Sequence, residues 1–466
     1  MIVATIGKTF LYAYNERYGK TFSAKEFFDS FYFECFFNHQ KYMLWVTNSP
    51  FVQMSSGQKT HSLQPAERIE KLENLHQKIL DGEIDASTAI GFPAAEEKEF
   101  ATTSGLVTDI GLLFDDEEIY LSWIGGGFGI GVTGAYTIFF NEPEILLKLY
   151  EGWHVYRQFL NDTTISELRG NQVNTWNGQW LNLSYGKQFR EDFDFAMLHA
   201  HNIFSRSDKN IEVNTVKWSE LFFNISRKFP HHTFTGYVYS LGKTNKTLGF
   251  YPFHFSQAQK LFDYYKILFG EQAALDDTRE YESLFGLHIK RACKLGSLGL
   301  QALEPKDLRK YYGNDSNLKL IKPVAARKKG EAEEDYSVRV KNAEQKDYEN
   351  LITFRTYKTW LLAMITKNKE ESLKYTAEVA LALHEYREGT TKTDRKNLIQ
   401  SELLVAKTKK SFLDALTTLI KDVDESKLKM FKSLRDKVHL MSAEDFGYFV
   451  VLIKFDYAFA ERERNS

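Results

Sequence analysis

Aromatic side chains are the feature that most limits how this chain can fold. They make up 15% of the 466 residues, with 37 Phe and 25 Tyr, whereas only 8 residues are Pro. Large rings bury a great deal of apolar surface and dominate the interiors that they enter. We therefore expect large cores filled with rings and few rigid linkers. A chain of this length usually forms two or three domains, each large enough for its own core.

The remaining composition is that of a folded protein. Hydrophobic residues make up 43% and charged residues 26%, which excludes a disordered, collagen-like or low-complexity chain. The two cysteines, Cys35 and Cys293, are too distant in sequence to suggest a disulfide framework or the spacing of a zinc site. The N-terminus lacks the basic start and apolar run of a secretion signal, and no stretch has about 18 uninterrupted apolar residues. We expect a cytoplasmic protein without a membrane partner.

Charge is distributed unevenly along the chain. The net charge is −2, which argues against a free-standing protein that coats DNA. Residues 1–300 contain 28 Lys and Arg against 35 Asp and Glu, a balance of −7, whereas residues 301–466 contain 32 against 27, a balance of +5. The C-terminal third is therefore the basic part.

The order of the sequence patterns predicts an α+β fold in three parts. Residues 1–320 are expected to form a mixed body with a strand-rich middle. Residues 321–345 combine basic and acidic side chains without apolar periodicity, which predicts an exposed charged linker. From 346 to 466, amphipathic runs separated by short polar turns predict a helical bundle.

Local signals predict individual elements of the body. Ser23 and Glu26 have the spacing of a capping box and open an expected buried helix over 23–45. A second helix is expected over Pro65–Leu80, between an N-terminal proline and Gly82. Short β-branched and aromatic runs predict strands over 118–124, 135–140, 180–186 and 233–241. A further helix is expected from residue 255.

The sequence gives little support for a catalytic or cofactor-binding motif. Gly129, Gly131 and Gly134 match G-x-G-x-x-G, but a strand-like run follows them instead of the helix that a dinucleotide site requires, so we favour a glycine hairpin. The segment 236–244 has one residue too many for a phosphate-binding P-loop and predicts a hairpin turn. The histidines, among them His199, His201, His231 and His232, do not have metal-site spacing, and Cys35 is expected to be a buried apolar residue. We expect no enzyme, with no catalytic residue, no metal and no cofactor.

The polar segment, residues 170–190, is the first candidate for binding. It interleaves amide side chains with tryptophans and ends in cations; the candidate contacts are Asn171, Gln172, Asn174, Asn177, Gln179, Lys187 and Arg190. Amides pair with adenine edges, aromatic rings stack on bases, and Lys and Arg neutralise phosphates. The alternative is a turn cluster between strands, with the tryptophans in the core.

Basic side chains in the C-terminal part are the second candidate. The candidates are Lys407, Lys409, Lys410, Lys432 and Arg435. They form either a surface that tracks phosphates or an ordinary solvated helix face.

Several segments together resemble the large subunit of type I CRISPR effector complexes (Cascade), especially divergent Myxococcus-type and related forms. The similarity lies in KYMLWVTNSPFVQ (41–53), ATTSGLVTDI (101–110), GNQVNTWNGQW (170–180) and the C-terminal runs FRTYKTWLLAMI and AKTKKSFLDALTTLI. None of these motifs is catalytic.

The resemblance implies a non-enzymatic subunit that binds at the foot of a guide-RNA complex. Such a subunit reads the protospacer-adjacent motif on double-stranded target DNA, helps to open the duplex and recruits a separate helicase-nuclease, while other effector subunits hold the guide RNA. The alternatives from other classes are an intracellular enzyme whose site carries no recognised motif and a phage-defence scaffold without nucleic-acid contact.

Overall fold

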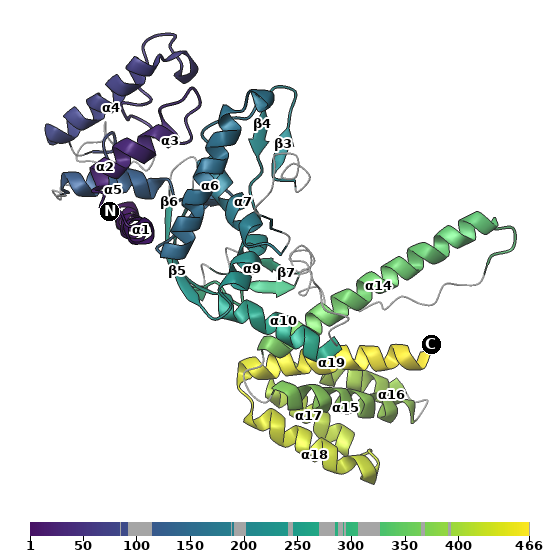
Figure 1. The fold of residues 1–466 in the computed structure, drawn as a ribbon. Coiled ribbons are helices and arrows are strands. Elements are labelled where there is room, and N and C mark those ends of the chain that lie inside the picture. The colour runs from purple at the N-terminus through teal and green to yellow at the C-terminus, as the bar shows by residue number, and fades with distance from the viewer. Residues whose placement is uncertain are drawn as a thin grey trace. The chain divides into compact units, whose positions relative to one another are not determined.

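The computed structural model describes residues 1–83, 85–91, 114–187, 189–190, 202–240, 246–269, 285–287, 292, 295–305, 327–364, 369–389 and 393–465. The protein has a mixed α+β fold, as expected (Figure 1). It divides into two compact units. Unit 1 comprises residues 1–256, 277–279 and 289–298, and unit 2 comprises 257–276, 280–288 and 299–466.

Most of the regular elements described in unit 1 are helices. They are α1 (Ile2–Tyr18), α2 (Ala24–Phe27), the π-helix η1 (Phe28–Phe33), α3 (Glu34–Phe36), the 3-10 turns η2 (Thr60–Ser62) and η3 (Thr163–Ile165), α4 (Pro65–Leu80), α5 (Asp116–Gly126), α6 (Pro143–Asn161), α7 (Val173–Ser184) and α9 (Trp218–Lys228). Helices α1 and α5 pack with their backbones close together at Gly7 and Gly125. A Cβ atom on Gly125 would lie 1.8 Å from the carbonyl oxygen of Val3, so only glycine fits there.

The predicted helix starts are confirmed, whereas two predicted strands are wrong. Ser23 and Glu26 form the expected capping box, although the helical segment ends at Phe36 instead of continuing to 45. Helix α4 spans the predicted Pro65–Leu80, and Gly82 follows it with a positive φ of 76°. Residues 118–124 lie in α5 and residues 180–184 in α7, both of which are helices. In α5, the Asp115 carboxylate accepts the backbone N–H of Glu118 and caps the helix.

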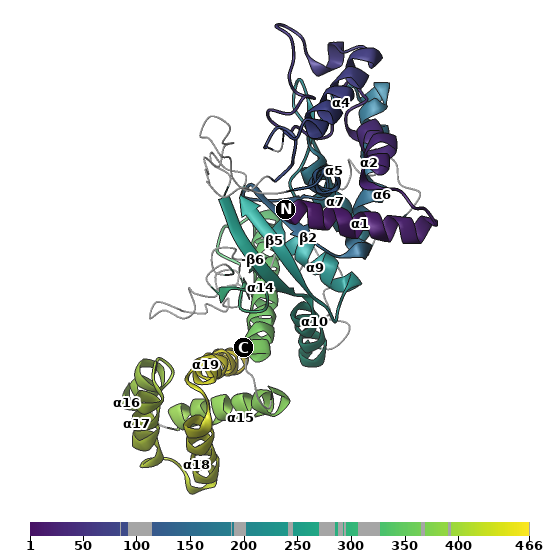
Figure 2. The same cartoon turned by 90° about the vertical axis from the view of Figure 1, so that its left-hand side faces the viewer.

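A four-stranded antiparallel sheet in unit 1 has the strand order β1-β2-β5-β6. Figure 2 labels three of these strands, β2, β5 and β6. The strands of the sheet are β1 (Ile130–Val132), β2 (Tyr136–Phe140), β5 (Thr233–Ser240) and β6 (Lys246–His254). The predicted strands over 135–140 and 233–241 are therefore confirmed as β2 and β5. Ile138 pairs with Val238, which sets the register between these strands. A second, two-stranded sheet joins β3 (Phe204–Arg206) to β4 (Ile211–Val213).

The glycine stretch forms the expected hairpin. Strands β1 and β2 are antiparallel neighbours, and Gly134 in the turn has a φ of 89°. Gly129 and Gly131 lie against Asn174. A Cβ atom on either glycine would come within about 3.1 Å of an atom of Asn174. These glycines therefore permit a turn and a close approach to α7.

Aromatic rings fill the core of unit 1, as predicted. Phe10 is fully buried with its ring centroid 4.6 Å from that of Phe128, and Phe128 stacks on Trp153 at 4.3 Å. The rings of Phe37 and Phe51 stack at 4.2 Å. Cys35 is buried among these side chains, and burial raises the pKa of its thiol to about 11.

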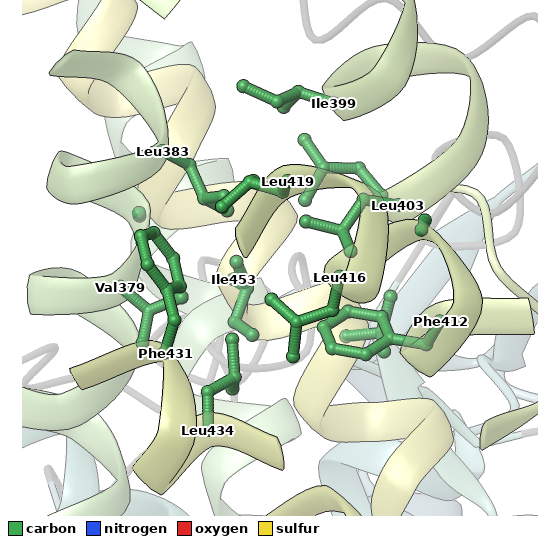
Figure 3. Packing of buried hydrophobic residues seen from close by; sticks show 14 of the residues in the cluster. Val379, Leu383, Ile399, Leu403, Phe412, Leu416, Leu419, Phe431, Leu434 and Ile453 are labelled. Carbon is green, nitrogen blue, oxygen red and sulfur yellow. The ribbon is translucent and has the colours of Figure 1, made fainter. Parts of the chain in front are cut away.

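Unit 2 ends in a helical bundle with its own core, as predicted. Its elements are α10 (Phe255–Phe269), of which the first two residues belong to unit 1, β7 (Phe285–Leu287), β8 (Leu303–Pro305), α14 (Glu333–Met364), α15 (Lys369–Glu388), α16 (Thr393–Asn397), the π-helix η5 (Leu398–Leu403), α17 (Lys409–Ile420), α18 (Glu425–Leu440) and α19 (Ala443–Asn465). The fully buried Val379, Leu383, Phe412, Phe431 and Ile453 meet at the centre of the bundle (Figure 3). The Trp360 indole donates to the Leu300 carbonyl and joins α14 to the segment before β8.

Most of the described part of the predicted linker is helical and exposed. Helix α14 begins at Glu333, so residues 333–345 are helical. Most side chains in this first part of α14 are exposed, and Arg339 forms an ion pair with Glu331 at 2.8 Å. This part of the helix buries little side-chain surface, so its sequence has no apolar stripe. The sequence pattern therefore indicated that these residues are exposed, but it did not indicate that they are helical.

Candidate nucleic-acid interface

Residues 173–184 of the polar segment form a largely buried helix, α7, and not a turn cluster between strands. Helix α7 packs against α6 and β1 of unit 1, and Trp176 is fully buried with its ring stacked on Tyr156 at 5.2 Å. Its indole N–H donates to the carbonyl oxygen of Gly152 at 2.7 Å. Trp180 packs on Gly152, where a Cβ atom would lie 2.4 Å from the indole.

Three of the predicted base-reading amides bind the protein's own backbone. The Asn177 amide is fully buried and donates to the carbonyl oxygens of Gly127 and Gly129 at 2.8 and 2.9 Å. The Gln179 amide donates to Asn214 O at 2.7 Å, and Gln172 Oε1 accepts the N–H of Val213 at 3.2 Å. Their hydrogen-bonding groups thus hold α7 against its neighbours, which corrects the prediction that these amides face a ligand.

The other members of the segment have different environments. Asn174 is half-buried, and its side-chain oxygen has no hydrogen-bond partner among the described residues. Asn171 is exposed just before α7, with a φ of 54°, and its backbone N–H donates to Tyr42 O. Lys187 and Arg190 are exposed beyond the end of α7. The segment therefore presents Asn171 at one end of the helix and these two cations at the other.

The sequence contains a signal for this arrangement. Val173, Trp176, Asn177, Trp180 and Leu181 recur at the spacing of one helical face and are all buried. The helical period is missed when Asn177 is counted as a polar surface residue, because its buried amide occupies one position of an otherwise apolar stripe.

The predicted basic residues of the bundle divide into two groups. Lys407, Lys410 and Lys432 are exposed, and none of them has an ion-pair partner among the described residues. Lys409 instead donates to the carbonyl oxygens of His439 and Met441 at the end of α18. Lysines at this position satisfy carbonyl groups that the helix leaves unpaired.

Arg435 makes only a local contact. Its guanidinium lies 2.7 Å from the carboxylate of the adjacent Asp436, and both side chains are more than half exposed. Lys409 thus has a structural role, while Lys407, Lys410, Lys432 and Arg435 remain accessible. They lie in unit 2, whereas the polar segment lies in unit 1.

The predictions for the histidines, the 101–110 segment and the absence of a membrane span concern residues that the structure describes only in part. His231 and His232 are exposed, and no group of three metal-binding side chains occurs within the described ranges. His199, His201 and the 101–110 segment lie outside the described residues, as does the turn between β5 and β6. In the part of the chain that the structure describes, no helix is long and apolar enough to cross a membrane.

Sequence patterns gave no particular role to four basic side chains of unit 1. His39 and Lys41 follow α3, Arg68 lies in α4 and Arg157 in α6. Each stands alone in sequence and has the appearance of an ordinary surface residue. The fold brings Arg157 to Lys41, whose carbonyl oxygen accepts a hydrogen bond from Arg157 Nη2 at 3.0 Å.

The chain matches no protein-family model, no curated protein sequence and no solved structure.

Proposed function

We propose that this protein is a non-catalytic large subunit of an RNA-guided CRISPR interference complex of type I. In that role it recognises the protospacer-adjacent motif of double-stranded target DNA, helps to open the duplex and recruits a helicase-nuclease. The observation that carries the proposal is the organisation of the chain: an α+β unit of about 250 residues precedes a helical bundle with a separate hydrophobic core. The resemblance of the sequence to the large subunits of Cascade implies this same order.

The exposed cations of the bundle support contact with nucleic acid. Lys407, Lys410 and Lys432 have their charged ends in solvent and are not neutralised by a described carboxylate. Cations of this kind contact phosphates irrespective of base sequence. A subunit that holds a displaced or target strand needs such contacts, because pairing with the guide RNA supplies the sequence readout.

The ends of α7 are the candidates for reading the motif. Asn171 is an exposed amide, and Lys187 and Arg190 are exposed cations. The buried amides of Asn177 and Gln179 act indirectly, since they fix the position of the helix. We therefore assign the direct contacts to the three exposed residues.

The first experiment tests assembly and motif reading. The full chain is co-expressed with candidate backbone subunits and a guide RNA from the same genome, and the purified complex is measured for binding to duplexes that differ only in the protospacer-adjacent motif. We expect Asn171→Ala to weaken motif-dependent binding by about 1 to 3 kcal/mol while guide RNA remains bound. A chain that fails to associate with any guide-RNA complex, or a genome without a neighbouring repeat array, contradicts the proposed function.

The second experiment tests the bundle through salt dependence. Each lost phosphate contact lowers the slope of log affinity against log salt by about 0.7 to 0.9, so the triple variant of Lys407, Lys410 and Lys432 to Ala should lower it by about 2 to 3. Matched and mismatched targets should weaken equally. A control triple variant, with Lys374, Lys396 and Lys421 changed to Ala, removes the same charge from other exposed sites of the bundle. Equal slopes for both triple variants would show that these lysines form only a solvated face.

A further inference from the structure

Four rings on one side of the sheet of unit 1 form a group that we call the aromatic face: Phe139 of β2, Tyr237 and Tyr239 of β5, and Phe250 of β6. Phe139 pairs with Tyr237 and Tyr237 with Phe250 in the register of the three strands, so these rings form a row across the sheet. The ring centroids of Tyr237 and Phe250 are 5.2 Å apart, and Tyr239 stacks on Phe139 at 5.7 Å. The four rings therefore form one continuous patch.

The aromatic face lies on the side of the sheet opposite to α9. Successive side chains of a strand point to opposite sides. Ile138 and Phe140, the neighbours of Phe139, line a small cavity together with Phe222 of α9, so Phe139 points the other way. Exposure increases across the row, because Phe139 is 3% exposed, Tyr237 is partly exposed and Phe250 is 61% exposed. The β6 end of the face is thus open to solvent.

A β-bulge brings a polar side chain to the same face. The register between β5 and β6 shifts between Val238 and Tyr239, so Tyr237 pairs with Phe250 whereas Tyr239 pairs with Thr247. The Tyr237 hydroxyl lies 3.0 Å from Thr247 Oγ1, which places both side chains on one side of the sheet. Bulges re-aim side chains in this way and are frequent beside functional sites. The hairpin therefore presents rings and hydroxyl groups together.

The charge of this part of the chain suits a polyanion. Between Glu220 and Asp263 the sequence contains five Lys and Arg residues and no Asp or Glu. Residues 233–254, which span β5 and β6, include Lys243 and Lys246. Phosphates are attracted by such a segment, since it has cations and no carboxylate that would repel them. Charge complementarity therefore favours a nucleic-acid strand over an acidic protein surface as the occupant of the face.

We propose that the aromatic face binds an unpaired strand of DNA or RNA, whose bases stack on Tyr237 and Phe250. Every base has a π-face, so stacking on exposed rings requires no particular base sequence. Exposed aromatic residues on a four-stranded antiparallel sheet stack two or three bases in a common class of RNA-binding domain. This site goes beyond the proposed function, which assigns contacts to the ends of α7 and to the lysines of the bundle, and it does not depend on it.

The test measures binding of fluorescently labelled strands of ten nucleotides, oligo(dT) and oligo(U), to the full chain by anisotropy. We expect Phe250→Ala to weaken binding by about five- to 150-fold, the loss that follows when one base can no longer stack. Phe250→Trp keeps a large ring and should bind like wild type, whereas Phe250→Leu keeps apolar volume without a ring and should bind as weakly as Phe250→Ala. The matched control is Tyr12→Ala, which removes a 71% exposed ring of α1 and should leave binding unchanged.

A strand without bases separates stacking from charge. Abasic strands of the same length keep the phosphates, so wild type and Phe250→Ala should bind them equally. The loss caused by Phe250→Ala on oligo(dT) should also be the same at low and high salt, because stacking releases no counterions. Tighter binding of oligo(dT) by wild type assigns the site to DNA, tighter binding of oligo(U) assigns it to RNA, and equal affinity assigns it to any unpaired strand.

Three results overturn the proposal. They are no binding of either strand by wild type, equal binding by wild type and Phe250→Ala, and an equal loss in Tyr12→Ala. If Phe250→Ala binds strands like wild type but no longer co-purifies with the backbone subunits of a guide-RNA complex, the face is a protein contact instead. The melting temperature of each variant serves as the folding control, and Phe250→Leu decides the question if Phe250→Ala does not fold.

Discussion

Replacing Asn177 with Ala tests directly whether the amides of α7 are structural. The side chain is fully buried, and its amide donates to the carbonyl oxygens of Gly127 and Gly129. Both glycines are buried, so water cannot replace the lost donor. A buried polar group left without a partner costs about 1 to 3 kcal/mol. With two carbonyl groups affected, we expect the free energy of unfolding of unit 1 to fall by about 2 to 5 kcal/mol.

The measurement is urea unfolding followed by tryptophan fluorescence. Every tryptophan except Trp360 lies in unit 1, so the signal reports on this unit. The matched control is Asn174→Ala, which changes the same residue type one turn earlier in α7. The side-chain oxygen of Asn174 lacks a partner within the described ranges, so its removal leaves no new unpaired group there. We expect this control to change stability by less than about 1 kcal/mol.

Two results would refute the reasoning. Equal losses of stability in the Asn177 and Asn174 variants would mean that the hydrogen bonds to the glycine carbonyls do not matter. An Asn177→Ala protein that unfolds like wild type but loses binding to target DNA would return this amide to the binding surface.

Three further predictions concern glycine packing, pH and helix capping. Gly125→Ala should destabilise unit 1 by several kcal/mol, because the new Cβ would overlap a backbone oxygen of α1. Gly447→Ala, at a position with no atom near the new Cβ, should instead stabilise α19 by about 0.5 to 1 kcal/mol. Thermal melting of both variants checks this prediction. Since the folded-state pKa of His39 is lowered to about 4, unfolded chains bind more protons between pH 4 and 6.5. Stability should therefore fall by about 1 to 3 kcal/mol as pH is lowered through this range in chloride buffer, and His39→Gln, followed by urea unfolding, should lose this part of the pH dependence. Lys409→Ala should destabilise the bundle by about 1 kcal/mol because it frees two carbonyl groups at the end of α18, while Lys410→Ala should leave its melting unchanged.

Signals of short range were sufficient for several elements of this fold. The Ser23 and Glu26 pair marks a helix start, because both partners of a capping box lie within one turn. Pro65 and Gly82 bracket α4 for the same reason: the backbone preferences of proline and glycine act locally. The ring-rich composition predicted aromatic cores, and the apolar periods after 346 predicted the bundle.

Tertiary structure alone decided the environment of each polar residue. The run over 118–124 has the residue types of a strand, yet it lies in a helix whose Gly125 lets it pack closely on α1. Asn177 has the same chemistry as an exposed amide, but its place on the buried face of α7 commits it to the backbone of the glycine hairpin. Arg157 of α6 donates to the carbonyl oxygen of Lys41, 116 positions away in sequence, because electrostatic interactions depend on distance in space and not on spacing along the chain.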